Sequence, residues 1–201
     1  MKRIFAGSLS VLLIVALSAF VGGLLVACGQ GQQGSTLSGA TSGIIDQVYE
    51  KGAAVLAPGK DFPQHDSKAL TAQDCQSIVG LITTSYDKYV EEATISQAMI
   101  NTSAHLVVLF KCKSDGDAAT LKSELTSSFD PGRWICVRPD QCFVQQAGSY
   151  VLLVAANADN AEALKAGFAA VAGVDASGAD VFYKGEGETA APSGDGGLVL
   201  K

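Results

Sequence analysis

The chain has 201 residues, of which 48% are hydrophobic, and its 14 basic and 20 acidic side chains give a formal charge of −6. Nucleic-acid binding requires a basic surface that offsets phosphate charge, so this acidic balance argues against a DNA- or RNA-binding protein. The composition also supplies no polybasic patch for docking on anionic lipid.

A targeting sequence opens the chain. Lys2 and Arg3 precede an apolar stretch that ends in Leu-Val-Ala-Cys at positions 25–28. A basic head, an apolar run and small residues before a cleavage site are typical of a secretory signal, and the last four residues resemble the lipobox of bacterial lipoproteins. The resemblance implies a signal peptide over residues 1–27, cleavage before Cys28, and attachment of fatty acyl chains, commonly palmitate, at Cys28. An uncleaved transmembrane helix is the alternative, because about 20 apolar residues can span a bilayer.

Polar segments flank the remaining chain. Residues 28–42 are rich in Gly, Gln and Ser and predict a flexible tether with a root-mean-square span of about 20 Å. Residues 185–201 have the composition of a disordered tail. Without residues 1–27 the chain keeps 12 basic and 20 acidic side chains, a charge of −8. We therefore expect attachment to the cell membrane through acyl chains rather than charge, with the protein facing outside the cytoplasm.

Residues 43–184 predict a single α+β domain of ordinary size. A helix is expected from Ser42, with apolar residues along one side, and the proline-containing segment 55–68 is expected to be a loop. Thr71 and Asp74 form a capping-box pattern, which predicts a second short helix after Thr71.

Two strand-strand-helix units follow. Residues 93–100 and 105–113 predict paired strands, with a helix from Asp115 that ends at Pro131-Gly132. The pattern recurs with strands over 143–147 and 150–156 and a helix from Asp159 to Gly173. We expect one antiparallel sheet of about four strands, with the helices against one face and additional N-terminal helices. An internal duplication and a chance repetition of a simple motif both account for the pattern.

A family resemblance rests on this region. Its motifs are residues 92–101 (Glu-Ala-Thr-Ile-Ser-Gln-Ala-Met-Ile-Asn), the apolar strand 106–113, Arg-Pro-Asp-Gln at 138–141 and Gly-Ser-Tyr-Val-Leu-Leu-Val at 148–154. Together with the lipobox and tether, they resemble the bacterial lipoproteins grouped as domain of unknown function 4358. The resemblance covers about residues 86–173, and the chain departs from it in its extra cysteines and a short link after Pro139. It implies fold and location, and no activity.

No familiar reaction centre is present in the sequence. The chain lacks Gly-x-Ser-x-Gly, Gly-x-x-x-x-Gly-Lys-Ser/Thr and His-Glu-x-x-His. His65 and Asp66 are consecutive, whereas a catalytic triad needs groups that converge from separate elements. His105 opens a strand, where a solvated polar side chain is expected. We predict no catalytic residue, no metal site and no cofactor.

One aromatic side chain stands out as a binding candidate. Trp134 follows Pro131-Gly132-Arg133 on the loop after a predicted helix. An aromatic residue on a loop can anchor a partner, and it can equally hold the loop against the core.

Four cysteines remain once Cys28 carries lipid. Cys136 and Cys142 flank a proline-containing turn, which predicts a disulfide between them and leaves Cys75 and Cys112 as the other pair. Zinc is an alternative, although structural zinc sites usually contain a Cys-x-x-Cys spacing that is missing here. Unpaired thiols are a second alternative, with Cys112 serving as a small apolar residue.

These features favour a non-enzymatic module of the cell envelope that holds a partner, either another envelope protein or a cell-wall component, at the membrane surface. The alternative is an extracytoplasmic enzyme, or an enzyme accessory, with a carboxylate site that has no motif. A solute-binding lipoprotein is disfavoured, because two-lobed binding proteins need a longer chain.

Overall fold

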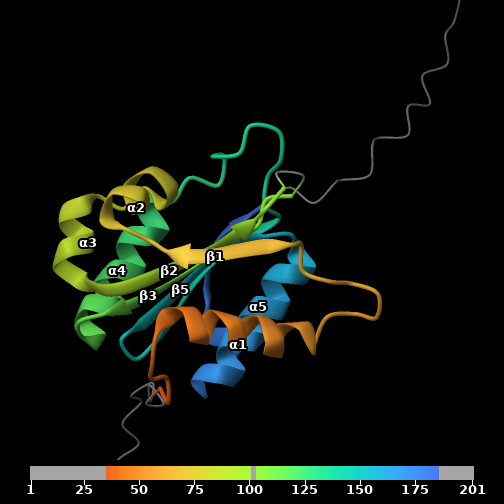
Figure 1. The fold of residues 1–201 in the computed structure, drawn as a ribbon, viewed down its shortest axis with the longest axis horizontal. Helices are drawn as coiled ribbons and strands as arrows, with labels where there is room; N and C mark the ends of the chain where they lie inside the picture. Colours follow the sequence, from red (N-terminus) through yellow and green to blue (C-terminus); the bar gives the residue numbers. More distant parts are fainter. Residues whose placement is uncertain (1–34, 101–102, 186–201) are drawn as a thin grey trace, which may run out of the picture. The chain divides into compact units, whose positions relative to one another are not determined.

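A six-stranded antiparallel sheet forms the centre of the structure (Figure 1), a computed structural model that describes residues 35–100 and 103–185. Two hairpins, β2–β3 and β4–β5, pair through β3 and β5, and β1 and β6 form the edges in the order β1-β2-β3-β5-β4-β6. The strand bounds are β1 His65–Ala69, β2 Val90–Ala98, β3 Leu106–Cys112, β4 Gln141–Ala147, β5 Tyr150–Ala156 and β6 Asp180–Lys184. The predicted α+β class is confirmed, and the described sheet has two strands beyond the four expected.

Five α-helices and a short 3-10 helix complete the described residues. Their bounds are α1 Thr41–Ala53, α2 Ala72–Val79, α3 Thr83–Tyr89, α4 Asp115–Ser128, α5 Ala158–Ala172 and η1 Ala176–Gly178. The predicted cap of α2 is present, because the Thr71 side chain accepts a hydrogen bond from the Asp74 amide at 3.2 Å. Gly173, at φ 67°, ends α5 in the left-handed conformation that glycine adopts without a Cβ clash.

Helices cover both faces of the sheet, and the expectation that they pack on one face is wrong. The α1 and α5 helices lie against one face, and α2, α3 and α4 lie against the other (Figure 1). The central strand β3 shows the consequence: Val108 and Phe110 face one layer, Val107 and Leu109 face the other, and all four are fully buried. A strand buried on both faces is apolar at nearly every position, so its sequence does not alternate.

The two strand-strand-helix units differ in where their helices lie. A rotation axis perpendicular to the sheet exchanges the two hairpins, and such a rotation keeps every element on its own face. The α4 helix nevertheless packs in the layer with α2, whereas α5 packs in the opposite layer with α1. The rotation perpendicular to the sheet therefore relates the two β-hairpins, but it does not relate the two strand-strand-helix units as a whole.

The layer of α1 and α5 is held together by a close approach of two glycines. A Cβ atom on Gly167 would lie 2.3 Å from the Val48 carbonyl oxygen, and one on Gly52 would lie 2.9 Å from the Ala163 carbonyl oxygen. The backbones of the two helices touch there, which larger residues would prevent.

The first described residues already contact the domain. The Thr36 amide donates to the Ala172 carbonyl at 3.2 Å, the Tyr150 hydroxyl donates to the Gly39 carbonyl at 3.0 Å, and Leu37 packs against the α1–α5 layer. Residues 35–42, which we expected within the tether, thus lie on the domain or in α1. The signal peptide, Cys28 and residues 186–201 of the predicted tail lie outside the described residues.

Both edge strands escaped the sequence analysis. The first four residues of β1 belong to the segment 55–68 that we expected to be a loop, and for residues 65–68 that expectation is wrong. Residues 66–69 of β1 are all exposed, so burial imposes no apolar alternation on them. The strand exists because its backbone pairs with β2, and propensity alone does not report such pairing.

Candidate functional site

The loop between α4 and β4 carries the predicted binding aromatic, Trp134. The α4 helix ends at Ser128, and a turn follows in which the Gly132 amide donates to Asp130 Oδ1 at 2.7 Å. The next four residues, Trp134 to Val137, form an apolar stretch between Arg133 and Arg138. No arginine other than Arg3 occurs elsewhere in the sequence.

Two contacts fix the base of this loop. The Arg133 guanidinium donates to the Ile78 carbonyl, the penultimate residue of α2, and lies 5.3 Å from the Trp134 ring centroid. Burial lowers the pKa of Arg133, an effect that the nearby Asp130 carboxylate opposes. The Trp134 ring packs edge-on against Phe129 at 6.5 Å. Trp134 therefore holds the loop against the core, one of the two roles considered for it.

The same side chain also lines an open groove, so the second role remains available to it. The groove has a volume of about 430 Å³ and is lined by Gln97, Arg133, Trp134, Ile135, Cys136 and Val137. Ile135 is 100% exposed, and Met99 and Ile100, which follow β2, are 68% and 62% exposed. Met99 lines a second opening with Gln97, the residue that also lines the groove. Isolated exposed apolar residues are common, so it is their grouping beside a groove that makes these residues a candidate interaction site. We call this set, Gln97, Met99, Ile100 and Arg133 to Arg138, the Trp134 surface.

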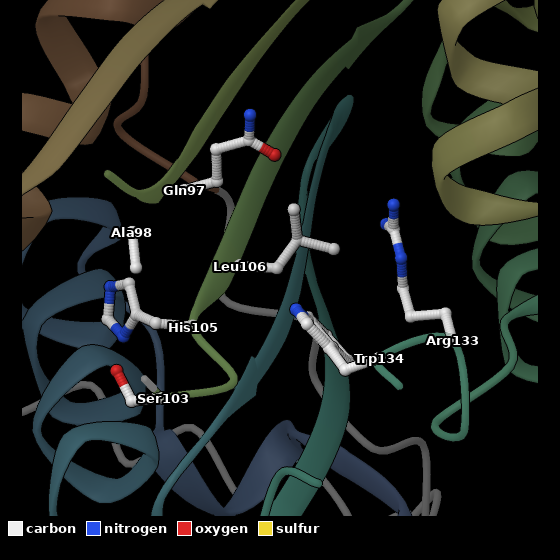
Figure 2. Close-up of a pocket in the computed structure, with 7 residues that line it drawn as sticks. All are labelled: Gln97, Ala98, Ser103, His105, Leu106, Arg133 and Trp134. Atoms are coloured by element: carbon white, nitrogen blue, oxygen red, sulfur yellow. The ribbon is translucent and has the colours of Figure 1, made fainter. Parts of the chain in front are cut away.

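A small pocket continues the groove toward the sheet. Figure 2 shows the Trp134 ring beside Leu106, with Gln97 above them and Arg133 to one side. The imidazole of His105 points the opposite way, toward the layer of α1 and α5. The pocket holds only about 30 Å³, room for roughly one water molecule, so it is too small for an organic ligand.

The predicted cysteine pairs are not bonded in the structure. Cys136 is exposed on the Trp134 surface, whereas Cys75, Cys112 and Cys142 are buried in the layer of α2 to α4. Burial raises the pKa of each of these three thiols to about 12, and the Asp117 charge adds to the effect at Cys112. Thiolate chemistry is therefore suppressed at all three buried cysteines.

His105 differs from its expected role as a solvated polar residue. It is 2% exposed, and its Nε2 lies 2.8 Å from the Tyr49 hydroxyl, which also donates to Ser96 Oγ at 3.1 Å. His65 stacks on the Tyr49 ring at 3.9 Å, and Phe62 closes the cluster from the side at 5.0 Å. β1 runs back over α1 and so carries His65 into this cluster. Because His65 and His105 are 40 residues apart in the chain, the sequence did not show that they lie close together.

Burial determines the protonation states in this polar cluster. Burial, together with the His65 charge, lowers the pKa of His105 to about 4. Burial raises the pKa of Tyr49, with a smaller opposing effect from the Ser96 hydrogen bond. Both groups are thus neutral near pH 7. Neither lines the outer groove, whereas His105 is among the residues that line the small pocket beside it.

Of the residues on this surface, Trp134 could be singled out from the sequence as a binding candidate, and its neighbours could not. Ile135, Met99 and Ile100 looked like ordinary strand or loop residues, and Gln97 looked like a strand residue. The available signal was the apolar stretch between Arg133 and Arg138, since apolar loop residues flanked by arginine are unusual in an acidic chain.

Within the described ranges, no group of three His, Cys, Asp or Glu side chains is placed to hold a metal ion. No helix in the same part of the chain is both long and apolar enough to cross a membrane. Comparison of the chain with protein-family models, with characterised proteins and with solved structures finds no match. The resemblance to the lipoproteins of domain of unknown function 4358 stays a prediction.

Proposed function

We propose that the chain is a bacterial lipoprotein, anchored outside the cytoplasm through acylated Cys28, that binds another envelope protein through the Trp134 surface without catalysing a reaction. One observation carries the proposal: an exposed apolar groove, rigid at its base and flanked by arginine, lies diagonally across the domain from the point where the chain enters it. Tryptophan and arginine are the residue types that contribute most to protein–protein affinity.

The position of the groove follows from the sheet register. The chain enters at Ser35, whose Cβ lies 3.1 Å from the position that a Cβ on Gly148 would take, in the turn between β4 and β5. Gln97, which lines the groove, pairs with Leu106, and Leu106 pairs with Ala155 near the far end of β5. Ala155 is five residue steps along β5 from Tyr150, about 17 Å along the strand.

The entry point and the groove also belong to different layers. Leu37 packs with α1 and α5, whereas Trp134 packs with α2 to α4. In Figure 1 the orange-red segment that leads into α1 lies toward the bottom, and the blue-green loop between α4 and β4 extends at the top. The seven residues from Cys28 to the first described residue reach at most about 25 Å. A domain that is joined to the membrane by so short a linker has its Trp134 surface pointing away from the lipid.

The chemistry of the surface favours a protein partner over a cell-wall glycan. Ile135, Met99 and Ile100 offer no hydrogen bonds, so they suit an apolar segment that leaves water on binding. Arg138 is exposed and Arg133 half-buried, and both suit an acidic group beside that segment. We therefore expect the partner to present an apolar stretch flanked by carboxylates.

Site-specific photo-crosslinking in intact cells tests the proposal. A benzophenone side chain replaces Ile135 in the full-length protein, and the matched control carries it at Val55, which is 59% exposed at the end of α1. We expect one protein adduct from position 135, none from position 55, and at least a tenfold lower yield when Arg138→Glu is added.

The other outcomes would overturn the proposal. Equal adducts from positions 135 and 55 would indicate nonspecific contact, and a lipid adduct from position 135 would place the surface against the membrane. A glycan adduct would make the partner a cell-wall component, and loss of every adduct would remove the binding role.

A further inference from the structure

The edge strand β1 offers an unpaired backbone to solvent. Among the described residues, β1 pairs with β2 on one side, and no strand pairs with it on the other. Asp66, Ser67, Lys68 and Ala69 are all exposed. An open edge of this kind is a template for a further strand, and many proteins block such edges to avoid it.

The hydrogen-bond pattern shows which backbone groups face outward. The Met99 amide donates to the Gln64 carbonyl, and the Leu70 amide donates to the Ala93 carbonyl, both at 2.9 Å. Hydrogen-bonded residues alternate along an antiparallel strand, so the even-numbered residues of β1 bond to β2. The amide and carbonyl groups of His65, Ser67 and Ala69 therefore point to the open side.

The strand is complementary to itself. If two copies of β1 pair antiparallel about their Ser67 residues, His65 of each copy stands opposite Ala69 of the other. Three of the five residue pairs in this register, His65 with Ala69 twice and Ser67 with Ser67, join outward-facing backbone groups. Each of these three pairs exchanges two hydrogen bonds, giving about six in total. Asp66 of each copy then stands opposite Lys68 of the other, so the register places two pairs of opposite charges across the interface.

The geometry points to a homodimer in which two β1 strands pair antiparallel about Ser67 and join the two sheets into one. A two-fold interface of this type uses the same surface on both copies, as most protein dimers do. Among the described residues, neither Asp66 nor Lys68 has an ion-pair partner within its own chain, so both charges are available to a second copy.

The other sheet edge lacks these properties. β6 contains a bulge opposite Cys142 and Phe143, which interrupts the alternation of its backbone groups. Its Asp180 is already paired with Lys122 at 2.8 Å. β6 is therefore an internal control for any experiment on β1.

The dimer is compatible with two anchors in one membrane. The two-fold axis is perpendicular to the joined sheet, so it keeps the α1–α5 layers of both copies on one side. The chain enters each copy on that layer, and the two Trp134 surfaces lie on the opposite side. The dimer thus would present two binding surfaces together, although its formation does not require the proposed partner.

A five-residue edge is a small interface, and confinement to a membrane raises the effective concentration that favours it.

Disulfide trapping in cells tests the interface and its register. In full-length protein with Cys136→Ser, Ser67→Cys places two thiols across the axis at a hydrogen-bonded pair, where Cα atoms lie about 5.5 Å apart, within disulfide range. The matched control is Val181→Cys on β6. We expect a covalent dimer of twice the chain mass from the Ser67→Cys protein and none from the control.

Charge exchange tests the register a second time. Lys68→Asp places two acidic side chains opposite each other on both sides of the axis, and we expect it to lower the trapped fraction about tenfold. The double variant Asp66→Lys/Lys68→Asp restores opposite charges and should restore trapping. Because all these positions are exposed, circular dichroism should show an unchanged fold.

Three results would overturn the homodimer. They are absence of the covalent dimer, equal trapping at position 181, and failure of the double variant to recover what the single variant loses. A disulfide from position 67 to a different polypeptide would show that the edge serves another partner. Ile135→Asp should leave trapping unchanged, so failure of this inference and failure of the proposed partner binding are distinguishable.

Discussion

The Tyr49 hydroxyl lies 2.8 Å from His105 Nε2 and donates its own proton to Ser96, so the imidazole must donate to Tyr49 through Nε2. The remaining nitrogen, Nδ1, is buried and has no hydrogen-bond partner in the described structure. His105 is consequently held in its neutral form, because a proton on Nδ1 would bring a charge into the core without a partner.

This arrangement predicts a loss of stability in mild acid. The pKa of His105 is about 4 in the folded protein and about 6.5 in an unfolded chain. Between these two pKa values the unfolded state binds a proton at His105 and the folded state does not. The free energy of unfolding therefore falls as the pH drops. We expect a fall of about 2 kcal/mol between pH 7 and pH 5, measured by urea denaturation.

Two variants identify the group responsible. His105→Gln should remove most of this pH dependence while keeping a polar partner for Tyr49. His65→Gln should keep most of it, because the His65 charge is the smaller cause of the shift. A pH dependence that survives His105→Gln would assign the effect to other groups.

The contact between α1 and α5 predicts a strong effect of adding one methyl group. Gly167→Ala would place Cβ 2.3 Å from the Val48 carbonyl oxygen, and the two helices must separate to admit it. We expect a loss of about 3 kcal/mol in the free energy of unfolding. Gly43→Ala is the matched control in α1, since a Cβ there meets no atom within 4 Å. That variant should be stabilised by about 0.5–1 kcal/mol, and equal effects at the two sites would refute the close approach.

The cysteines predict one reactive thiol in the native protein. Cys136 is exposed, whereas the other three cysteines of the domain are buried, with pKa values raised to about 12 by that burial. Alkylation of folded, unreduced protein at pH 8, followed by mass spectrometry, should modify Cys136 alone. After denaturation without reductant, Cys75, Cys112 and Cys142 should react as well. A Cys136 that reacts only after reduction would instead support the predicted disulfide with Cys142.

The lipobox predicts the consequence of removing Cys28. Cys28→Ala should prevent acylation, leaving either an unprocessed precursor or a released protein. Metabolic labelling with a palmitate analogue, combined with membrane fractionation, measures both results. A Cys28→Ala protein that still carries label and fractionates with the membrane at the processed size would disprove the anchor.

The sequence by itself was enough to predict the helices and strands whose own residues carry a clear pattern of apolar spacing, capping or turns. Apolar spacing from Ile44 to Tyr49 defined α1, and the Thr71 and Asp74 pattern defined the start of α2. The central hairpins were equally clear, because their strands are apolar and short polar turns join them. The predicted lipid site depends only on a linear pattern, so no folding is needed to recognise it.

The tertiary structure alone decided how these elements combine. The continuous apolar run of β3 is consistent with burial on both faces, but which helices lie on which face depends on packing between distant segments. β1 forms through backbone pairing with β2, which its exposed polar side chains do not encode. The Trp134 surface joins Gln97 to residues nearly 40 positions later, and His65 reaches Tyr49 only after β1 folds back over α1. Each of these contacts joins residues far apart in the chain, and no local preference of either residue specifies its partner.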